Sequence, residues 1–549
     1  MYKSEIINQF INADYITNEQ AQRLLASDDF SISAIIKNGF CSKSQVLDVV
    51  AKYYGLDVCD VQLIDVDQRL ISNFSQNLML KNKFLPISLI DEELTVAIAN
   101  PTNPMALSPI KAIHQGKIKY LLALEEDLTN VIQSLMASSD TSIALQGLGE
   151  KDLANADEPI KNENEILNAP AVKLVDSLIN EAISLKASDI HIEPFEKTVR
   201  VRYRIDGSLY LRADFPIESY PATCARLKIL AGINIAEHRI PQDGRFNQTV
   251  GGVEYDFRIS TLPTSHGEKF VVRILDKSSF SFTRKELGFT DEETVTVDKI
   301  LAHPHGIVLL TGPTGCGKST TLYSFLKELN REEVNIVTVE DPVEYTLHGV
   351  NQTQVNTKAN LTFASALRSI LRQDPNIIMI GEIRDEETAQ IAIRAAITGH
   401  LVFSTLHTND AVGSINRLID MGIPPYLVAD AVVGAIAQRL VKKLCPKCKQ
   451  KTISTVSEQN LLKLDSPREI YHPVGCPYCN HTGYKGRIAV HEIMYVNDKI
   501  RDAINNRSTL YELKCLSKEN GMSTLWESCK NLVLDGIVSI SELITLFNE

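Results

Sequence analysis

The chain has no long apolar run. None of its 549 residues belongs to a stretch that approaches the roughly 18 consecutive apolar residues needed to cross a membrane. The first residues, MYKSEIINQFINADYITNEQ, also lack the basic start and the apolar core of a secretory signal. We therefore expect a cytoplasmic protein, which can work at a membrane only by docking on a partner or on the membrane surface.

Positive charge is not in excess either. The sequence has 56 lysines and arginines against 68 aspartates and glutamates, which gives a net charge of −12. Proteins bind nucleic acid largely through lysines and arginines that neutralise phosphates. The charge balance therefore argues against nucleic acid as the main partner, although a local basic patch is compatible with it.

Disulfide bonds are not expected, although the chain has ten cysteines. Four of them form two close pairs, Cys445-Pro-Lys-Cys448 and Cys476-Pro-Tyr-Cys479. In a reducing compartment, such pairs indicate a structural Zn²⁺ held by four thiolates, with no open position for water. The alternative is a set of structural thiols without metal. Residues 449–475 exceed the roughly 15–20 residues that commonly separate such pairs, so we expect an insert that loops out.

Composition and periodicity predict an α/β multidomain fold. Residues 138–168 are polar, acidic and weakly patterned, which favours a flexible linker over a surface loop. Between about residues 286 and 440, strands alternate with helices, as is typical of a parallel sheet covered on both faces. The predicted parts are an N-terminal α/β domain (1–137), the linker (138–168), a smaller α/β domain (169–285), the alternating domain (286–440), a four-cysteine zinc subdomain (441–496) and a C-terminal helical region (497–549).

Short patterns predict elements within these parts. In the N-terminal domain, FLPISLI, ELTVAIANPTNP and IKYLLAL predict three strands. In the smaller domain, TVRVRYRIDGSLYLRA predicts a hairpin that turns at Asp206-Gly207. We find no internal repeat.

A phosphate-binding loop is predicted at TGPTGCGKST. The segment follows the strand GIVLL, precedes the helix TLYSFLKEL, and fits G-x-x-x-x-G-K-[ST]. In such loops backbone N–H groups surround phosphate oxygens, the lysine reaches the β- and γ-phosphates, and the hydroxyl binds Mg²⁺. The alternative is a glycine-rich structural turn. The predicted nucleotide-binding residues are Gly312, Pro313, Thr314, Gly315, Cys316, Gly317, Lys318, Ser319 and Thr320, with Ser319 also a Mg²⁺ ligand.

Two acidic segments are candidates for the chemistry of hydrolysis. In IIMIGEIRDEET a strand ends at Gly381 and delivers Glu382, and in IVTVEDPVEY a strand leads to Glu344. Hydrolysis needs one group that positions water and another that holds Mg²⁺. We assign Glu344 to the water and Glu382 to the metal, and the reverse assignment stays open. The simpler alternative is that such acids cap helices or are solvated; it weighs most for Asp341, which precedes proline.

Histidines flank the strand LVFSTL. His407, followed by Thr-Asn-Asp, is the better candidate for a sensor that donates a hydrogen bond to the γ-phosphate. His400 lies at the other end of the strand. A lone histidine is more often structural.

In chain order, the segments TGPTGCGKST, VTVEDPVEY, IIMIGEIRDEET and TGHLVFSTLHTNDA resemble the nucleotide-binding motifs of the secretion ATPases, the family that powers type II secretion and type IV pilus assembly. The resemblance continues through ASDIHIEP, PQDGR and FRISTLPTSHGEKFVVRIL upstream, and through AQRLVKKLCPKC and GCPYCNHTGYKGR downstream. It covers roughly residues 170–549. The N-terminal domain resembles the family more loosely, and the cyclic di-GMP-binding pattern of some members is not found there.

The resemblance implies a hexameric ATPase with a RecA-like P-loop core, preceded by a smaller PAS-like domain. Arg258 and Arg273 match the family's arginines that reach nucleotide phosphates, although arginines on such strands are otherwise surface residues paired with acids. Arg200, Arg202 and Arg204 alternate along one strand and so share a face. We expect them to form salt bridges between domains or subunits.

The resemblance also implies partners and an output. The zinc subdomain would contact an inner-membrane platform protein and anionic lipid, and residues 1–137 would dock a further partner. ATP hydrolysis would drive the assembly of pilin into a type IV pilus, which the N-terminal segment favours. Type II secretion is the alternative, favoured by PYLVADAVVGAIAQRL. A nucleic-acid translocase and a non-hydrolysing scaffold are more distant ones.

Overall fold

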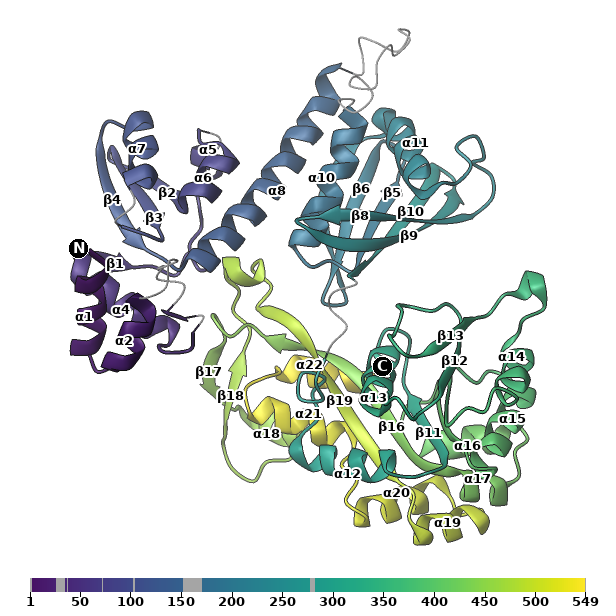
Figure 1. The fold of residues 1–549 in the computed structure, drawn as a ribbon. Helices are drawn as coiled ribbons and strands as arrows, with labels where there is room; N and C mark the ends of the chain where they lie inside the picture. Colours follow the sequence, from purple (N-terminus) through teal and green to yellow (C-terminus); the bar gives the residue numbers. More distant parts are fainter. Residues whose placement is uncertain are drawn as a thin grey trace. The chain divides into compact units, whose positions relative to one another are not determined.

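The computed structural model describes residues 2–25, 35–36, 38–71, 73–101, 104–151, 170–276 and 282–548 (Figure 1). The chain divides into two compact units, residues 1–275 with 476–480 and residues 276–475 with 481–549. Among the described helices, none combines the length and the apolar character that crossing a membrane requires.

The N-terminal domain contains two hydrophobic cores. Among the described residues, α1, α2 and α4 contribute most of the first core, and a four-stranded sheet with the order β1-β4-β3-β2 contributes to the second. The three predicted strands are confirmed as β2, β3 and β4. The helices are α1 (Tyr2–Asn12), α2 (Asn18–Leu25), α4 (Lys43–Tyr54), α5 (Gln68–Ile71), α6 (Gln76–Asn82) and α7 (Pro104–Ile113), and the strands are β1 (Asp57–Val58), β2 (Phe84–Ile90), β3 (Glu93–Ile98) and β4 (Lys117–Leu122).

The predicted linker is partly wrong. Residues 138–151 belong to the long helix α8 (Glu125–Lys151), whose first turn carries three acidic side chains that favour a helix N-terminus. Leu128 and Ile132 lie in the core of the N-terminal sheet, whereas Ala144 packs into the core of the following domain. Packing against α10 (Pro170–Ser184) therefore makes a weakly patterned segment helical. Residues 152–168 of the predicted linker lie outside the described residues.

The smaller domain is an antiparallel sheet with the order β7-β6-β5-β10-β9-β8. The predicted hairpin is confirmed, since Ile205 pairs with Ser208, and both Asp206 (φ 49°) and Gly207 (φ 88°) adopt the positive φ that a tight hairpin turn requires. Its strands are β5 (Asp189–Pro194), β6 (Thr198–Ile205), β7 (Ser208–Pro216), β8 (Gln242–Val250), β9 (Val253–Thr264) and β10 (Gly267–Asp276), and α11 is Tyr220–Ala231.

The second unit is built on a sheet with the order β13-β12-β14-β15-β11-β16-β19. All neighbours in it are parallel except β16 and β19. The strands are β11 (Gly306–Thr311), β12 (Ile336–Glu340), β13 (Asn351–Gln354), β14 (Ile377–Ile380), β15 (Leu401–Leu406), β16 (Val432–Leu444) and β19 (Tyr484–Tyr495).

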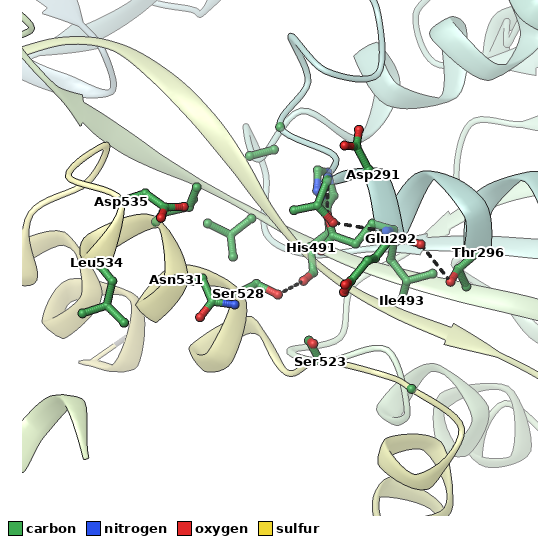
Figure 2. A pocket seen from close by; sticks show the side chains of 17 residues that line it. Asp291, Glu292, Thr296, His491, Ile493, Ser523, Ser528, Asn531, Leu534 and Asp535 are labelled. Atoms are coloured by element: carbon green, nitrogen blue, oxygen red, sulfur yellow. Dashed lines mark hydrogen bonds between the residues drawn. The ribbon is translucent and has the colours of Figure 1, made fainter. Parts of the chain in front are cut away.

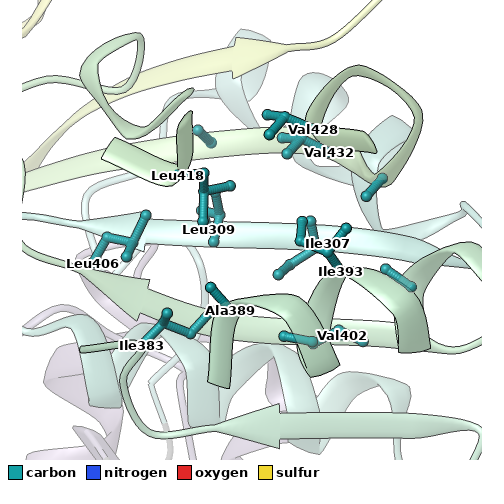
Figure 3. Packing of buried hydrophobic residues seen from close by; sticks show 14 of the residues in the cluster. Ile307, Leu309, Ile383, Ala389, Ile393, Val402, Leu406, Leu418, Val428 and Val432 are labelled. Carbon is teal, nitrogen blue, oxygen red and sulfur yellow. The ribbon is translucent and has the colours of Figure 1, made fainter. Parts of the chain in front are cut away.

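Helices cover both faces of this sheet, as predicted. Alternate residues of β11 face opposite cores: Ile307 and Leu309 lie in one cluster, and Val308 and Leu310 lie in the other. Figure 3 shows the first cluster. The helices are α12 (Asp291–Leu301), α13 (Lys318–Leu329), α14 (Phe363–Ile370), α15 (Glu386–Ile397), α16 (Gly413–Asp420) and α17 (Pro425–Ala431).

The predicted boundary at residue 440 is also wrong, because β16 runs through it. The antiparallel pairing of β16 with β19 joins the cysteine subdomain to the main sheet. The predicted insert is present as the hairpin β17 (Gln450–Ile453) and β18 (Glu469–His472) with α18 (Val456–Leu462). The predicted C-terminal helices are α19 (Asp498–Asn505), α20 (Leu510–Glu519), α21 (Leu525–Leu534) and α22 (Ile540–Asn548).

Candidate nucleotide site

The predicted phosphate loop connects the fully buried strand β11 to α13. Gly312, Gly315 and Gly317 have φ values of 146°, 79° and 91°, which side chains rarely adopt. A Cβ atom at Gly317 would also lie 2.9 Å from Nε2 of Gln438. The loop therefore depends on glycine for its conformation and for close packing, and it leads into the N-terminus of α13, an arrangement that suits phosphate oxygens.

Lys318 lies over this loop. Its Nζ atom donates hydrogen bonds to the carbonyl oxygens of Gly312 (2.7 Å) and Pro313 (3.0 Å). Burial lowers the pKa of Lys318. Pro313, Thr314, Gly315 and Ser319 are exposed, so the loop is accessible to a ligand.

Glu382 lies just beyond β14, and the structure brings it together with His407. Oε2 of Glu382 lies 3.5 Å from Nε2 of His407, and Oε1 forms an ion pair with Arg384. The hydrogen bond to Glu382 raises the pKa of Arg384. Arg384 is not among the predicted site residues, although its position two residues after Glu382 is a signal that could have indicated it.

The other acidic segment, IVTVEDPVEY, contains two glutamates in different environments, Glu340 and Glu344. Glu340, at the end of β12, is buried and accepts hydrogen bonds from Tyr323, Thr338 (2.5 Å) and Gln352 (3.0 Å), so its carboxylate organises the local fold. Glu344 is half-buried in the following loop, where its N–H donates to the Tyr323 hydroxyl (3.3 Å).

The loop after β15 is tied to the phosphate-loop strand. Oγ1 of Thr311, the last residue of β11, accepts a hydrogen bond from the N–H of Thr408 (2.9 Å). This contact fixes the residue next to His407. His400, at the start of β15, places Nδ1 3.0 Å from the Ala395 carbonyl oxygen, in agreement with a structural role.

Arg258 and Arg273 lie on β9 and β10 of the first unit. Nε of Arg273 donates to Oδ1 of Asp189 (3.0 Å), yet 60% of the Arg273 side chain is exposed. Arg258 is half-buried and pairs across the sheet with Arg245.

The salt bridges expected between domains or subunits for three further arginines are instead found within their own domain. Each side chain meets an acid on a neighbouring strand, because strand pairing places them side by side. The pairs are Arg200 with Asp214 (3.4 Å), Arg202 with Glu193 (2.7 Å) and Arg204 with Asp189 (3.5 Å).

The two cysteine pairs come together. The sulfur atoms of Cys445, Cys448, Cys476 and Cys479 all lie within 4.8 Å of one another, and those of Cys476 and Cys479 are 3.7 Å apart. Tetrahedral Zn²⁺ with Zn–S bonds of about 2.3 Å requires sulfur atoms about 3.8 Å apart. The donor set therefore fits zinc.

Comparison with known proteins identifies the family. A family model described as "Type II/IV secretion system protein" matches residues 164–545, and an MshEN domain model matches residues 54–142. The "Type IV pilus assembly ATPase PilB" of Myxococcus xanthus is 41% identical over 524 residues, covering 93% of this chain and 92% of the relative. The chain belongs to the type II/IV secretion ATPase family.

Other relatives of this secretion ATPase are named for type II secretion. The "Type II secretion system ATPase E" of Vibrio cholerae is 45% identical over 433 residues, covering 77% of this chain and 86% of the relative. The Legionella pneumophila ATPase DotB has a similar fold, with a TM-score of 0.52 and 22% identity over 72% of this chain and 98% of its own. The predicted family, ATPase class and RecA-like core are confirmed, and ATP and Mg²⁺ follow from the class.

The secretion ATPase also has a cavity of about 550 Å³ between α12, β19 and α21, and none of the predicted site residues lines it (Figure 2). His491, in the cavity wall, is 1% exposed, and its ring stacks on Phe289 with 3.8 Å between centroids. Neither ring nitrogen has a hydrogen-bond partner among the described residues. Burial lowers the pKa of His491 to about 3, so the folded protein holds a neutral imidazole.

We predict that His491 makes the second unit acid-sensitive. The pKa of His491 in the folded protein lies below its ordinary value of about 6.5. The unfolded chain therefore binds the proton first, and the free energy of unfolding falls as the pH drops below about 6.5. Lowering the pH from 7.5 to 5 should cost about 2 kcal/mol through this residue. Denaturant unfolding of His491→Phe should show a correspondingly weaker dependence on pH, whatever its stability at pH 7.5.

His348→Phe is the matched control, since His348 is exposed in the same unit. It should unfold with the pH dependence of the parent protein. An unchanged dependence in His491→Phe would show that His491 is not the source of the acid sensitivity.

Proposed function

We propose that the chain is a cytoplasmic, homohexameric motor that hydrolyses ATP to assemble pilin subunits into a type IV pilus at the inner membrane. The observation that supports this function best is the PilB match, which is 41% identical and covers 93% of this chain. Type II secretion is the second candidate, because the Vibrio cholerae relative is 45% identical over 433 residues.

In this proposal, residues 312–320 hold the phosphates, with Lys318 reaching the β- and γ-phosphates. Mg²⁺, when bound, neutralises charge on the phosphates, and Ser319 and Glu382 would hold it. Arg384 and His407 contact the Glu382 carboxylate, which would hold Mg²⁺ in place of one of these contacts. His407 would donate a hydrogen bond to the γ-phosphate and so sense its presence, and Glu344 would orient the attacking water.

We propose that Arg258 and Arg273 supply positive charge to the phosphates of a nucleotide held by the second unit of the same or of a neighbouring subunit. A guanidinium binds phosphoryl oxygens through two parallel hydrogen bonds. Arg273 suits this role because Asp189 orients its Nε while most of the side chain stays exposed.

The partners follow from the same proposal. The cysteine subdomain contacts an inner-membrane platform protein and anionic lipid at the periphery of the membrane. Residues 1–137 dock a further partner of the machine, and no nucleic acid is involved.

Deleting the gene in the organism that encodes the chain tests the function. We expect loss of surface pili with normal export of secreted enzymes, restored by the parent gene and not by Lys318→Ala, because the motor needs its phosphate contact. Pili are counted by electron microscopy, and exported proteins are measured in the culture medium. Loss of export with normal pili would establish type II secretion. Normal pili together with normal export would contradict both candidates.

Two carboxylate variants separate the proposed roles. Glu344→Gln should lower kcat about 10²–10⁴-fold at an unchanged Mg²⁺ requirement, since it removes the group that orients water. Glu382→Gln should instead raise the Mg²⁺ concentration needed for half-maximal activity. Glu333→Gln, on an exposed loop of the same unit, should behave as the parent.

Steady-state ATP hydrolysis titrated with Mg²⁺ measures both quantities. The opposite pattern would exchange the two assignments. If both variants had the kinetics of the parent protein, neither Glu344 nor Glu382 would take part in hydrolysis.

We also propose that the four-cysteine cluster binds one structural Zn²⁺. Such sites contribute about 10–16 kcal/mol of apparent binding free energy, which organises a subdomain with little core of its own. Elemental analysis should give one zinc per chain, and Cys448→Ser should lose it and expose residues 445–480 to proteolysis. Cys515→Ser, outside the cluster, should keep the metal. A metal-free parent protein with an intact subdomain would contradict the site.

A further inference from the structure

Gln438 contacts the phosphate loop from a neighbouring strand. It lies in the middle of β16, which runs parallel to β11, and it is 1% exposed. Its Nε2 atom donates a hydrogen bond to the carbonyl oxygen of Cys316 (2.8 Å), and its Oε1 atom accepts one from Oγ1 of Thr321 (2.8 Å). One buried amide therefore connects the end of the loop to the first turn of α13.

This contact bears directly on the N–H groups that bind phosphate. The carbonyl of Cys316 and the N–H of Gly317 belong to one planar trans peptide, so they point in opposite directions. Holding the carbonyl at Gln438 aims the Gly317 N–H away from β16 and into the loop. Without this partner, the peptide is free to rotate and the loop loses part of its preorganised set of donors.

The backbone packs closely at the same place. A Cβ atom at Gly312 would lie 2.5 Å from the Gln438 carbonyl oxygen, and one at Gly317 would lie 2.9 Å from the Gln438 Nε2 atom. Both ends of the loop thus pack against Gln438, which leaves little room for a side chain at Gly312 or Gly317.

Arg439 extends the connection to the loop that carries His407. Its side chain is buried, and it donates hydrogen bonds from Nη1 to the Gln438 carbonyl oxygen (3.1 Å) and from Nη2 to the Asn409 carbonyl oxygen (3.2 Å). Burial is the main cause of the lowered pKa of Lys318, and the charge of Arg439 adds to it. The arginine therefore lies close enough to affect the lysine electrostatically while its hydrogen bonds hold two loops in register.

We propose that Gln438 and Arg439 are positioning residues for ATP hydrolysis. Gln438 orients the Cys316–Gly317 peptide toward the phosphates, and Arg439 keeps the His407 loop in register with it. The proposal rests on the ATPase class of the chain and not on pilus assembly, so failure of the pilus experiment would leave it intact.

The test compares ATP binding and turnover in the purified full-length protein. Gln438→Met keeps the length of the side chain but removes both hydrogen bonds, and Thr321→Val removes only the contact to α13. Gln438→Met should weaken binding of a fluorescent ATP analogue and raise the KM for ATP roughly five- to thirtyfold, as expected for a lost hydrogen bond to a buried group. Thr321→Val should have a smaller effect in the same direction.

Arg439 is tested by its effect on kcat. Arg439→Gln should lower kcat more than it changes the KM for ATP, because the variant displaces the His407 loop and leaves the phosphate loop in place. Arg439→Lys keeps a donor and the charge, so it should recover part of the activity.

A matched control and the thermal midpoint distinguish positioning from a purely structural role. Gln459→Met removes the hydrogen bond from Nε2 to the Ser454 carbonyl oxygen (2.8 Å) in the cysteine insert, and it should leave KM and kcat at parental values. A lower Tm for Gln438→Met with parental KM and kcat would overturn the proposal. If Gln438→Met does not fold, parental KM and kcat in both Thr321→Val and Arg439→Gln would overturn it.

Discussion

The parallel pairing of β11 with β15 and β16 is the constraint on which the candidate site depends. Parallel neighbours end at the same edge of a sheet, so the phosphate loop after β11 and the His407 loop after β15 emerge together. The hydrogen bond between Thr311 and Thr408 then fixes the two loops to each other. A shift of one strand by one residue would reverse every side chain between the two cores and separate these groups.

The charges at this edge are already partnered before any nucleotide binds. Lys318 donates to carbonyl oxygens of its own loop, and Glu382 is held by Arg384 and His407. These contacts limit the cost of half-buried charge, which would otherwise be high. In the proposed function, phosphate would replace the carbonyl hydrogen bonds of Lys318, and Mg²⁺ would replace one contact of Glu382.

The first cysteine pair is joined directly to a strand of the ATPase core. The strand β16 pairs with β11 over residues that adjoin the phosphate loop, continues along β19, and ends at Leu444, directly before Cys445. Residues of β16 and β19 also pack against α21 and α22 in one hydrophobic cluster. A continuous strand therefore leads from the neighbourhood of the phosphate loop to the first cysteine of the cluster.

The sequence by itself determined the features that short-range chemistry specifies. The phosphate loop needs glycines at a fixed spacing before Lys318, the hairpin needs positive φ at Asp206 and Gly207, and the cysteine pairs have the spacing of metal ligands. The helical state of residues 138–151 was decided by tertiary packing, because their weak pattern becomes stable only against α10. The same holds for Gln438, which meets Cys316 across 122 residues of sequence and has no local signal. The pairing of Glu382 with His407 likewise needed the order of the strands, which only the assembled sheet provides.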